Sequence, residues 1–167
     1  MTNQAPRDRA EEIVEQWRRE RPDLDPTPFL VIGRLHRVAN ALTTELTRVY
    51  AEYGLGEGEF DVLATLRRQG GDCALTPSDL ADQTVVTSGA ATKRVDRLVA
   101  LGYVERRPSG HDGRSRLVAL TPSGRALIDE AFTAHMANEE RLLSTLSTSE
   151  RTGLERGLLA LARSFGV

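Results

Sequence analysis

Residues 87–116 have the sequence TSGAATKRVDRLVALGYVERRPSGHDGRSR, and this stretch decides the fold that we predict. Its first half has apolar residues at helical spacing, and its second half has two β-type segments around a turn rich in Pro, Ser, Asp and Gly. Seven Lys and Arg side chains against three Asp and Glu give it a net charge of +4, whereas the whole chain is −2. A basic island in an acidic protein is typical of a phosphate-binding surface, and a solvated charged face is the alternative.

The segment just before this stretch has the features of a helix start. Thr76 is a good N-cap, Pro77 suits the first helical position, and Asp79 stands where a capping box needs its acidic residue. We therefore expect a short helix over residues 76–83.

A second, basic helix and a β-hairpin follow in the sequence. Thr87 or Ser88 caps a predicted helix that ends near Leu101, at Gly102. Strands are expected at 103–106 and 116–120, with the turn between them. Two helices joined by a tight turn and followed by a hairpin form a winged helix-turn-helix, in which the second helix enters the DNA major groove.

Positions on the second helix separate into two faces. Ala91, Val95 and Leu98 form an inward row, and the opposite row is small or basic. Small residues at the helix start permit close approach to DNA, long cations reach phosphates or bases, and wing arginines enter the minor groove. The residues that we expect to face DNA are Thr87, Ser88, Gly89, Lys93, Arg97, Asp112, Arg114 and Arg116.

Two of these assignments have a structural alternative. Arg97 is a candidate for an ion pair with Asp96 or Glu105. Asp112 is expected to brace the wing turn and to hold Arg114, and an ordinary Asp-Gly surface turn is the alternative.

Helices are predicted on both sides of this unit. The apolar spacing indicates helices at about 7–20, 28–53, 58–68, 122–146 and 148–165. The fold class is therefore mainly α with a small β-wing. We expect an N-terminal helix and linker at 1–27, a DNA-binding domain at 58–121, and dimerisation helices at 28–57 and 122–167. The outer helices carry apolar stripes that a second copy of the chain would cover, and packing within one chain is the alternative.

Several other functional classes lack support in the sequence. The chain has no apolar run long enough to span a membrane and no signal-peptide core, so we expect a cytoplasmic protein. Its single cysteine, Cys73, excludes an internal disulfide. His36, His111 and His135 have no metal-ligand spacing, and no nucleophile–base pair or phosphate loop can be assembled. We therefore expect neither a cofactor nor an enzyme.

These residues closely resemble the MarR family of bacterial transcription regulators over about 28–165. The resemblance implies a homodimer that binds a pseudo-palindromic double-stranded DNA operator and often represses transcription. The motifs that carry it are LTPSDLA at 75–81, TSGA at 87–90, VDRL at 95–98, LGYVER at 101–106, Asp112-x-Arg114, and LTP at 120–122.

A narrower resemblance is to the urate-responsive subgroup, which has an extra N-terminal helix. The positions that match its ligand residues are Trp17, Asp61, Arg94 and Arg106. The resemblance implies a small anionic effector, urate or a related acid, that meets a stacking ring, guanidinium groups and a carboxylate. Structural alternatives are an amphipathic-helix anchor for Trp17, a helix-dipole role for Asp61, and phosphate contacts for the two arginines.

Three further hypotheses remain open at this point. Cys73 lies near Arg67 and Arg68, which would favour a thiolate, so a redox-sensing repressor is one of them. The others are a MarR-type DNA-binding protein without a specific ligand and a helical interaction module that has lost DNA binding.

Overall fold

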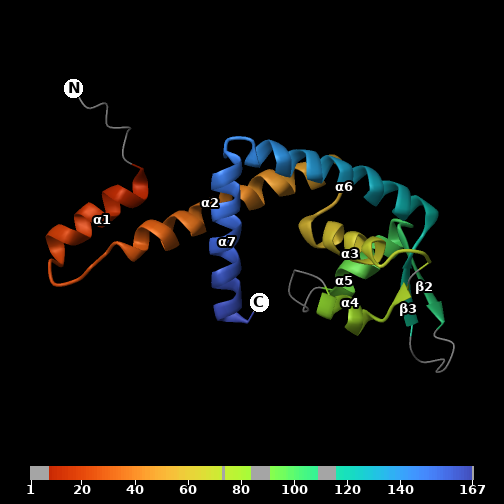
Figure 1. The fold of residues 1–167 in the computed structure, drawn as a ribbon. Helices are drawn as coiled ribbons and strands as arrows, with labels where there is room; N and C mark the ends of the chain where they lie inside the picture. Colours follow the sequence, from red (N-terminus) through yellow and green to blue (C-terminus); the bar gives the residue numbers. More distant parts are fainter. Residues whose placement is uncertain (1–7, 73, 84–90, 109–115, 167) are drawn as a thin grey trace. The chain divides into compact units, whose positions relative to one another are not determined.

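The computed structural model describes residues 8–72, 74–83, 91–108 and 116–166, and it is mainly helical with one small sheet (Figure 1). This confirms the predicted fold class. None of the described helices is long and apolar enough to cross a membrane. The elements in chain order are α1 Arg9–Glu20, α2 Pro28–Glu52, α3 Glu57–Arg68, β1 Ala74–Leu75, α4 Pro77–Gln83, α5 Ala91–Ala100, β2 Val104–Pro108, β3 Arg116–Leu120, α6 Pro122–Leu143 and α7 Thr148–Phe165.

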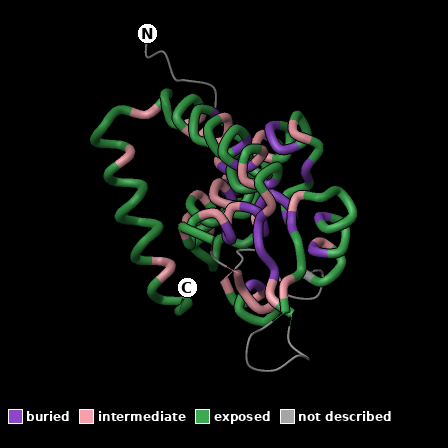
Figure 2. The backbone as a smooth tube through the Cα atoms, turned by 90° about the vertical axis from the view of Figure 1, so that its right-hand side faces the viewer, coloured by how far each residue is buried: buried purple, intermediate pink, exposed green. Residues whose placement is uncertain are grey.

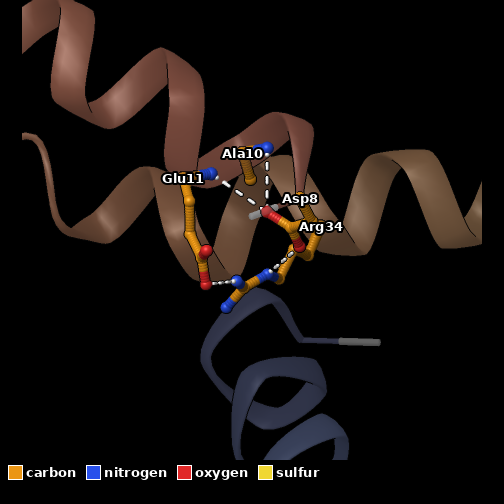
Figure 3. A network of polar contacts seen from close by, with 4 residues as sticks. All are labelled: Asp8, Ala10, Glu11 and Arg34. Atoms are coloured by element: carbon orange, nitrogen blue, oxygen red, sulfur yellow. Dashed lines mark hydrogen bonds and ion pairs between the residues drawn. The ribbon is translucent and has the colours of Figure 1, made fainter. Parts of the chain in front are cut away.

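The chain divides into two compact units, residues 1–45 and 46–167, which we describe separately. In the first unit, the Asp8 side chain caps α1 by accepting hydrogen bonds from the backbone N–H groups of Ala10 and Glu11. The Arg34 guanidinium on α2 donates to Asp8 at 2.7 Å and to Glu11 at 2.8 Å (Figure 3). The hydrogen bond from Arg34 lowers the pKa of Asp8, so one carboxylate both caps α1 and ties it to α2.

The second unit is built around the helices that flank the predicted turn. Leu63 of α3, Leu80 of α4 and Leu98 of α5 are fully buried and belong to one apolar cluster. Val95 is also buried, so the inward face of α5 is confirmed at Val95 and Leu98, while the side chain of Ala91 lies outside the described residues. Figure 2 shows the buried positions gathered in this unit.

The sheet has one strand that the sequence analysis missed. β3 lies in the centre of the order β1-β3-β2, and both pairings are antiparallel. The hairpin register pairs Val104 with Leu120, and β1 adds the pair Ala74–Ala119. Because β1 has two residues, it is too short to show alternation in the sequence, and its pairing with β3 defines it.

Three helix caps are present in the second unit, among them the predicted cap at Thr76. Thr76 Oγ1 accepts from the Asp79 N–H, and Thr121 Oγ1 accepts from the Gly124 N–H at 3.0 Å. Ser147 and Glu150 form the capping box of α7. Each cap satisfies backbone donors that the helix itself leaves unpaired.

The start of α6 is fixed to the turn that ends α5. The hydroxyls of Thr121 and Ser123 both donate to the Gly102 carbonyl oxygen, at 2.7 and 3.0 Å. Gly124 lies so close to the Tyr103 carbonyl that a methyl group at this position would overlap it. The turn that ends α5 and the start of α6 are therefore joined by a packed contact between two backbone segments.

We predict that Gly124→Ala lowers the free energy of unfolding by about 1–3 kcal/mol, because the Tyr103 backbone has to shift. Urea denaturation followed by circular dichroism measures this change. Gly153→Ala on α7 is the matched control: open space surrounds it, and alanine is expected to stabilise the helix by up to about 1 kcal/mol. Equal effects of the two variants would contradict the close packing at Gly124.

Candidate nucleic-acid interface and effector site

The basic residues predicted to face DNA are exposed wherever the structure describes them. Lys93 and Arg97 lie one turn apart on α5, and Arg116 begins β3. The remaining predicted positions, Thr87, Ser88, Gly89, Asp112 and Arg114, lie outside the described residues. The described part of the candidate interface thus includes a helix whose apolar face is buried and whose opposite face carries cations.

Arg97 has a protein partner that the sequence analysis did not identify. Its Nε lies 3.2 Å from Oε1 of Glu59, in the first turn of α3. The Arg97 side chain is 60% exposed and that of Glu59 is 10% exposed. The partners that we had considered for Arg97 bind other arginines: Asp96 accepts from Arg106 and Glu105 accepts from Arg107.

Glu59 is held in place by a second contact. Its Oε2 accepts the Gly56 backbone N–H at 2.6 Å, which caps α3. The spacing Gly56-x-x-Glu59 is a capping pattern that could have been found in the sequence. The contact with Arg97 could not have been found there, because it depends on how α5 lies on α3.

The side chain of Arg94, a predicted effector residue on α5, lies against the same turn of α3. Its guanidinium lies over Gly58, where any added methyl group would overlap the Nε and Cζ atoms. Asp61 follows Gly58 by three residues and is half-buried. The structure therefore directs Arg94 towards α3, on a different side of α5 from the exposed Lys93.

Arg106, the predicted effector residue at the base of the wing, forms an ion pair at the surface. Its Nη2 donates to Asp96 Oδ1 at 2.6 Å, and the Asp96 carboxylate is more than half exposed. This ion pair joins β2 to α5. An anion that recruits Arg106 would have to compete with Asp96 for it.

Arg107, the next residue on β2, anchors the turn after α3. It donates to Asp72 Oδ2 and to Glu105 Oε1, each at 2.7 Å. These hydrogen bonds raise the pKa of Arg107 and lower that of Asp72. Arg125 of α6 also donates to the Gly71 carbonyl. The turn leads to Cys73, which lies outside the described residues.

Trp17, the fourth predicted effector residue, belongs to the first unit. Its side chain is 53% exposed, which is unusual for a tryptophan. It lines a shallow groove of about 360 Å³ together with Asp25, Pro26, Pro28, Phe29 and Ile32. An exposed indole beside apolar side chains offers a stacking surface within this unit.

An aromatic cluster in the second unit was also missed. Tyr50 stacks on Phe60 with ring centroids 4.0 Å apart, and His135 lies 5.1 Å from Phe60. The Tyr50 hydroxyl is 3.3 Å from His135 Nδ1, and His135 Nε2 is 3.2 Å from a Glu139 oxygen. The sequence showed only single aromatic residues on three different helices.

A separate hollow of about 400 Å³ lies between α3 and α6. The Arg67 guanidinium contacts the Asp129 carboxylate across it, at 2.6 Å. Its wall consists of Ala64, Arg67, Arg68, Ile128, Asp129, Phe132 and Thr133, and so includes none of the four predicted effector residues. Among the described residues, no group of three or more His, Cys, Asp or Glu side chains is placed to hold a metal ion.

Known proteins resemble this chain in sequence and in fold. Residues 53–115 match the model of the MarR family. The chain is 44% identical over 148 residues to the HTH-type transcriptional regulator PecS of Dickeya dadantii, covering 89% of each protein. The chain belongs to the MarR family of transcriptional regulators.

Two solved structures have related folds. A variant of MarR from E. coli in complex with operator DNA aligns with a TM-score of 0.68 and 28% identity, over 87% of this chain and 96% of that one. BpsR of Bordetella bronchiseptica, whose DNA binding is regulated by 6-hydroxynicotinic acid, aligns with a TM-score of 0.69 and 25% identity, over 79% and 92%. The similarity of fold thus extends beyond the residues that the family model matches.

Tyr50 gives a test of the aromatic cluster. Burial, together with the charges of Glu139, Glu57 and Asp61, raises its pKa from 10.0 to about 12. Because the unfolded chain releases this proton first, the free energy of unfolding should fall as the pH rises from about 10 to 12. We predict that Tyr50→Phe removes part of this fall, measured by urea denaturation across that range. An identical fall in both proteins would contradict the burial of the Tyr50 hydroxyl.

Proposed function

We propose that this MarR-family regulator is a repressor that binds a pseudo-palindromic operator as a homodimer and is released by a small anionic metabolite, urate or a related acid. The observation that supports DNA binding is the outer face of α5, where Lys93 and Arg97 are exposed while Val95 and Leu98 are buried. A helix presented in this way on a winged unit matches the geometry that enters a major groove.

The proposal assigns a separate role to each part of the chain. Residues 58–121 read DNA, residues 28–57 and 122–167 form the dimer, and residues 1–27 add the N-terminal helix and linker. Support for the dimer comes from α7, in which none of the described residues is buried although Leu154, Leu158 and Leu159 are large and apolar (Figure 2). Helices with exposed apolar stripes are stabilised by a partner, and a symmetric second copy is the commonest one.

Salt dependence tests the DNA-binding role. We expect the logarithm of the association constant for a duplex enriched from a randomised library to fall linearly with the logarithm of the salt concentration. Lys93→Gln should reduce the slope by about 0.9 per protomer, because one phosphate contact is lost. Fluorescence anisotropy of labelled DNA measures it. Arg19→Gln on α1 removes an equivalent charge from a helix that the proposal assigns neither to DNA nor to the dimer, so it should leave the slope unchanged. A reduction of the slope as large as that of Lys93→Gln would argue against the α5 interface.

The effector proposal rests on the chemistry around the first turn of α3. Arg94 supplies a guanidinium, Asp61 supplies a carboxylate one helical turn from Gly58, and Arg106 is held by an exposed partner that an anion can displace. Guanidinium groups pair with planar anions through two parallel hydrogen bonds. The related BpsR is regulated by 6-hydroxynicotinic acid, a planar acid, which supports an effector of this class.

The positions of these arginines link effector binding to release of the protein from DNA. Arg94 is part of α5 and Arg106 is part of β2, so an effector that prefers them in a different arrangement would move the DNA-reading elements. The effector must bind that arrangement more tightly than the DNA-bound one, since equal affinity for both shifts nothing. Operator DNA must then weaken effector binding by the same factor.

Trp17 provides the test, because it is the only tryptophan of the chain. We predict that urate or a related planar acid quenches its fluorescence and releases DNA, and that Arg94→Ala abolishes both effects. Lys93→Ala is the matched control: it is adjacent and exposed, so it should weaken DNA binding and leave the quenching intact. Quenching that persists in Arg94→Ala, or DNA release by none of the acids, would overturn the effector proposal.

A further inference from the structure

The ion pair between Glu59 and Arg97 has a consequence for DNA affinity. Arg97 lies on the exposed face of α5 and is one of the two described α5 cations assigned to DNA, while Glu59 is almost completely buried in α3. The Glu59 carboxylate is fixed from two sides, by the Gly56 N–H at 2.6 Å and by Arg97 at 3.2 Å. A negative charge is therefore held beside a side chain that has to meet negatively charged phosphate.

We propose that Glu59 is a positioning residue that competes with DNA for Arg97 and so sets the affinity of the protein for DNA. This inference rests on the proposed DNA-binding role of α5. In the free protein, the carboxylate takes the place that a DNA phosphate occupies in the complex. DNA binding then exchanges one anionic partner of Arg97 for another. This exchange reduces the net binding free energy that the contact between Arg97 and phosphate contributes.

The geometry favours competition over simple support of Arg97. A carboxylate that only supported an arginine would hold it through a short pair of parallel hydrogen bonds. Here the contact is a single one, made by the inner Nε at 3.2 Å, and the Arg97 side chain is 60% exposed, so the arginine can leave it. The shorter contact of Glu59 is to Gly56, so its position is set by the helix cap and does not depend on Arg97. The carboxylate consequently stays in place when Arg97 leaves.

The same first turn contains a matched control. Glu57 is two residues away on α3, has the same charge and is exposed. Replacing either glutamate with glutamine removes one negative charge per protomer. Glutamine at position 59 can keep its carbonyl oxygen on the Gly56 N–H, with the amide NH₂ turned to Arg97, so the helix cap is retained while the attraction is lost.

The experiment measures binding of a duplex enriched from a randomised library to the full-length protein by fluorescence anisotropy. Glu59→Gln should tighten binding about five-fold, on the order of what two weak ion pairs, one from each protomer of the proposed dimer, contribute. Glu57→Gln should change it less than about two-fold, because this side chain has no contact with Arg97. In an Arg97→Gln background, Glu59→Gln should have no effect, which a double-mutant cycle shows directly.

Three outcomes would overturn the inference while DNA binding itself stands. These are weaker binding by Glu59→Gln, an equal gain from Glu57→Gln, and a gain that persists without Arg97. Absence of DNA binding by the unaltered protein would overturn the proposed function and the inference together. Thermal denaturation of each variant separates these results from a loss of folding.

A measurement on the unaltered protein covers the case in which Glu59→Gln fails to fold. The ¹³C signal of the Glu59 carboxyl group reports whether Arg97 remains its partner. Addition of the same duplex should shift this signal, because Arg97 leaves, and the signal of Glu57 serves as the reference. An unchanged Glu59 signal in the DNA complex would overturn the competition.

Discussion

The packing of α5 against α3 is the contact on which the proposed DNA-binding face depends. Val95 and Leu98 are buried in the cluster that contains Leu63, so the rotation of α5 about its own axis is fixed. Because that rotation is fixed, Lys93 and Arg97 lie on the outer face, while Arg94 lies over Gly58. An apolar contact thereby decides which cations are available to DNA and which lie against the neighbouring helix.

The sequence predicted most of the helices and the hairpin because their signals are local. Caps at Thr76, Thr121 and Ser147 lie within three residues of the groups that they satisfy, so spacing alone identifies them. The pairing of β1 with β3 joins segments more than 40 residues apart. A two-residue strand has no periodicity of its own, and its presence follows from the strand beside it.

The candidate site shows the same division between local and distant information. The basic face of α5 was predictable from helical spacing, whereas the partners of its arginines were not. Asp96 and Glu105 are neighbours of Arg97 in sequence, yet Arg97 meets Glu59, because the first turn of α3 packs beside it. Gly58 is similar: its small size matters only because the Arg94 side chain crosses it. Such contacts depend on the angle between two helices, which sequence patterns do not specify.

Two arginines one turn apart on α5 thus meet successive residues, Gly58 and Glu59, of a single turn of α3. A displacement of this turn would change both contacts together, since the backbone of a helix moves as a unit. In the proposed mechanism, an anion that draws Arg94 away would also alter the distance between Arg97 and Glu59. DNA affinity and effector response would then be coupled through one short segment, and no long pathway between distant sites is required.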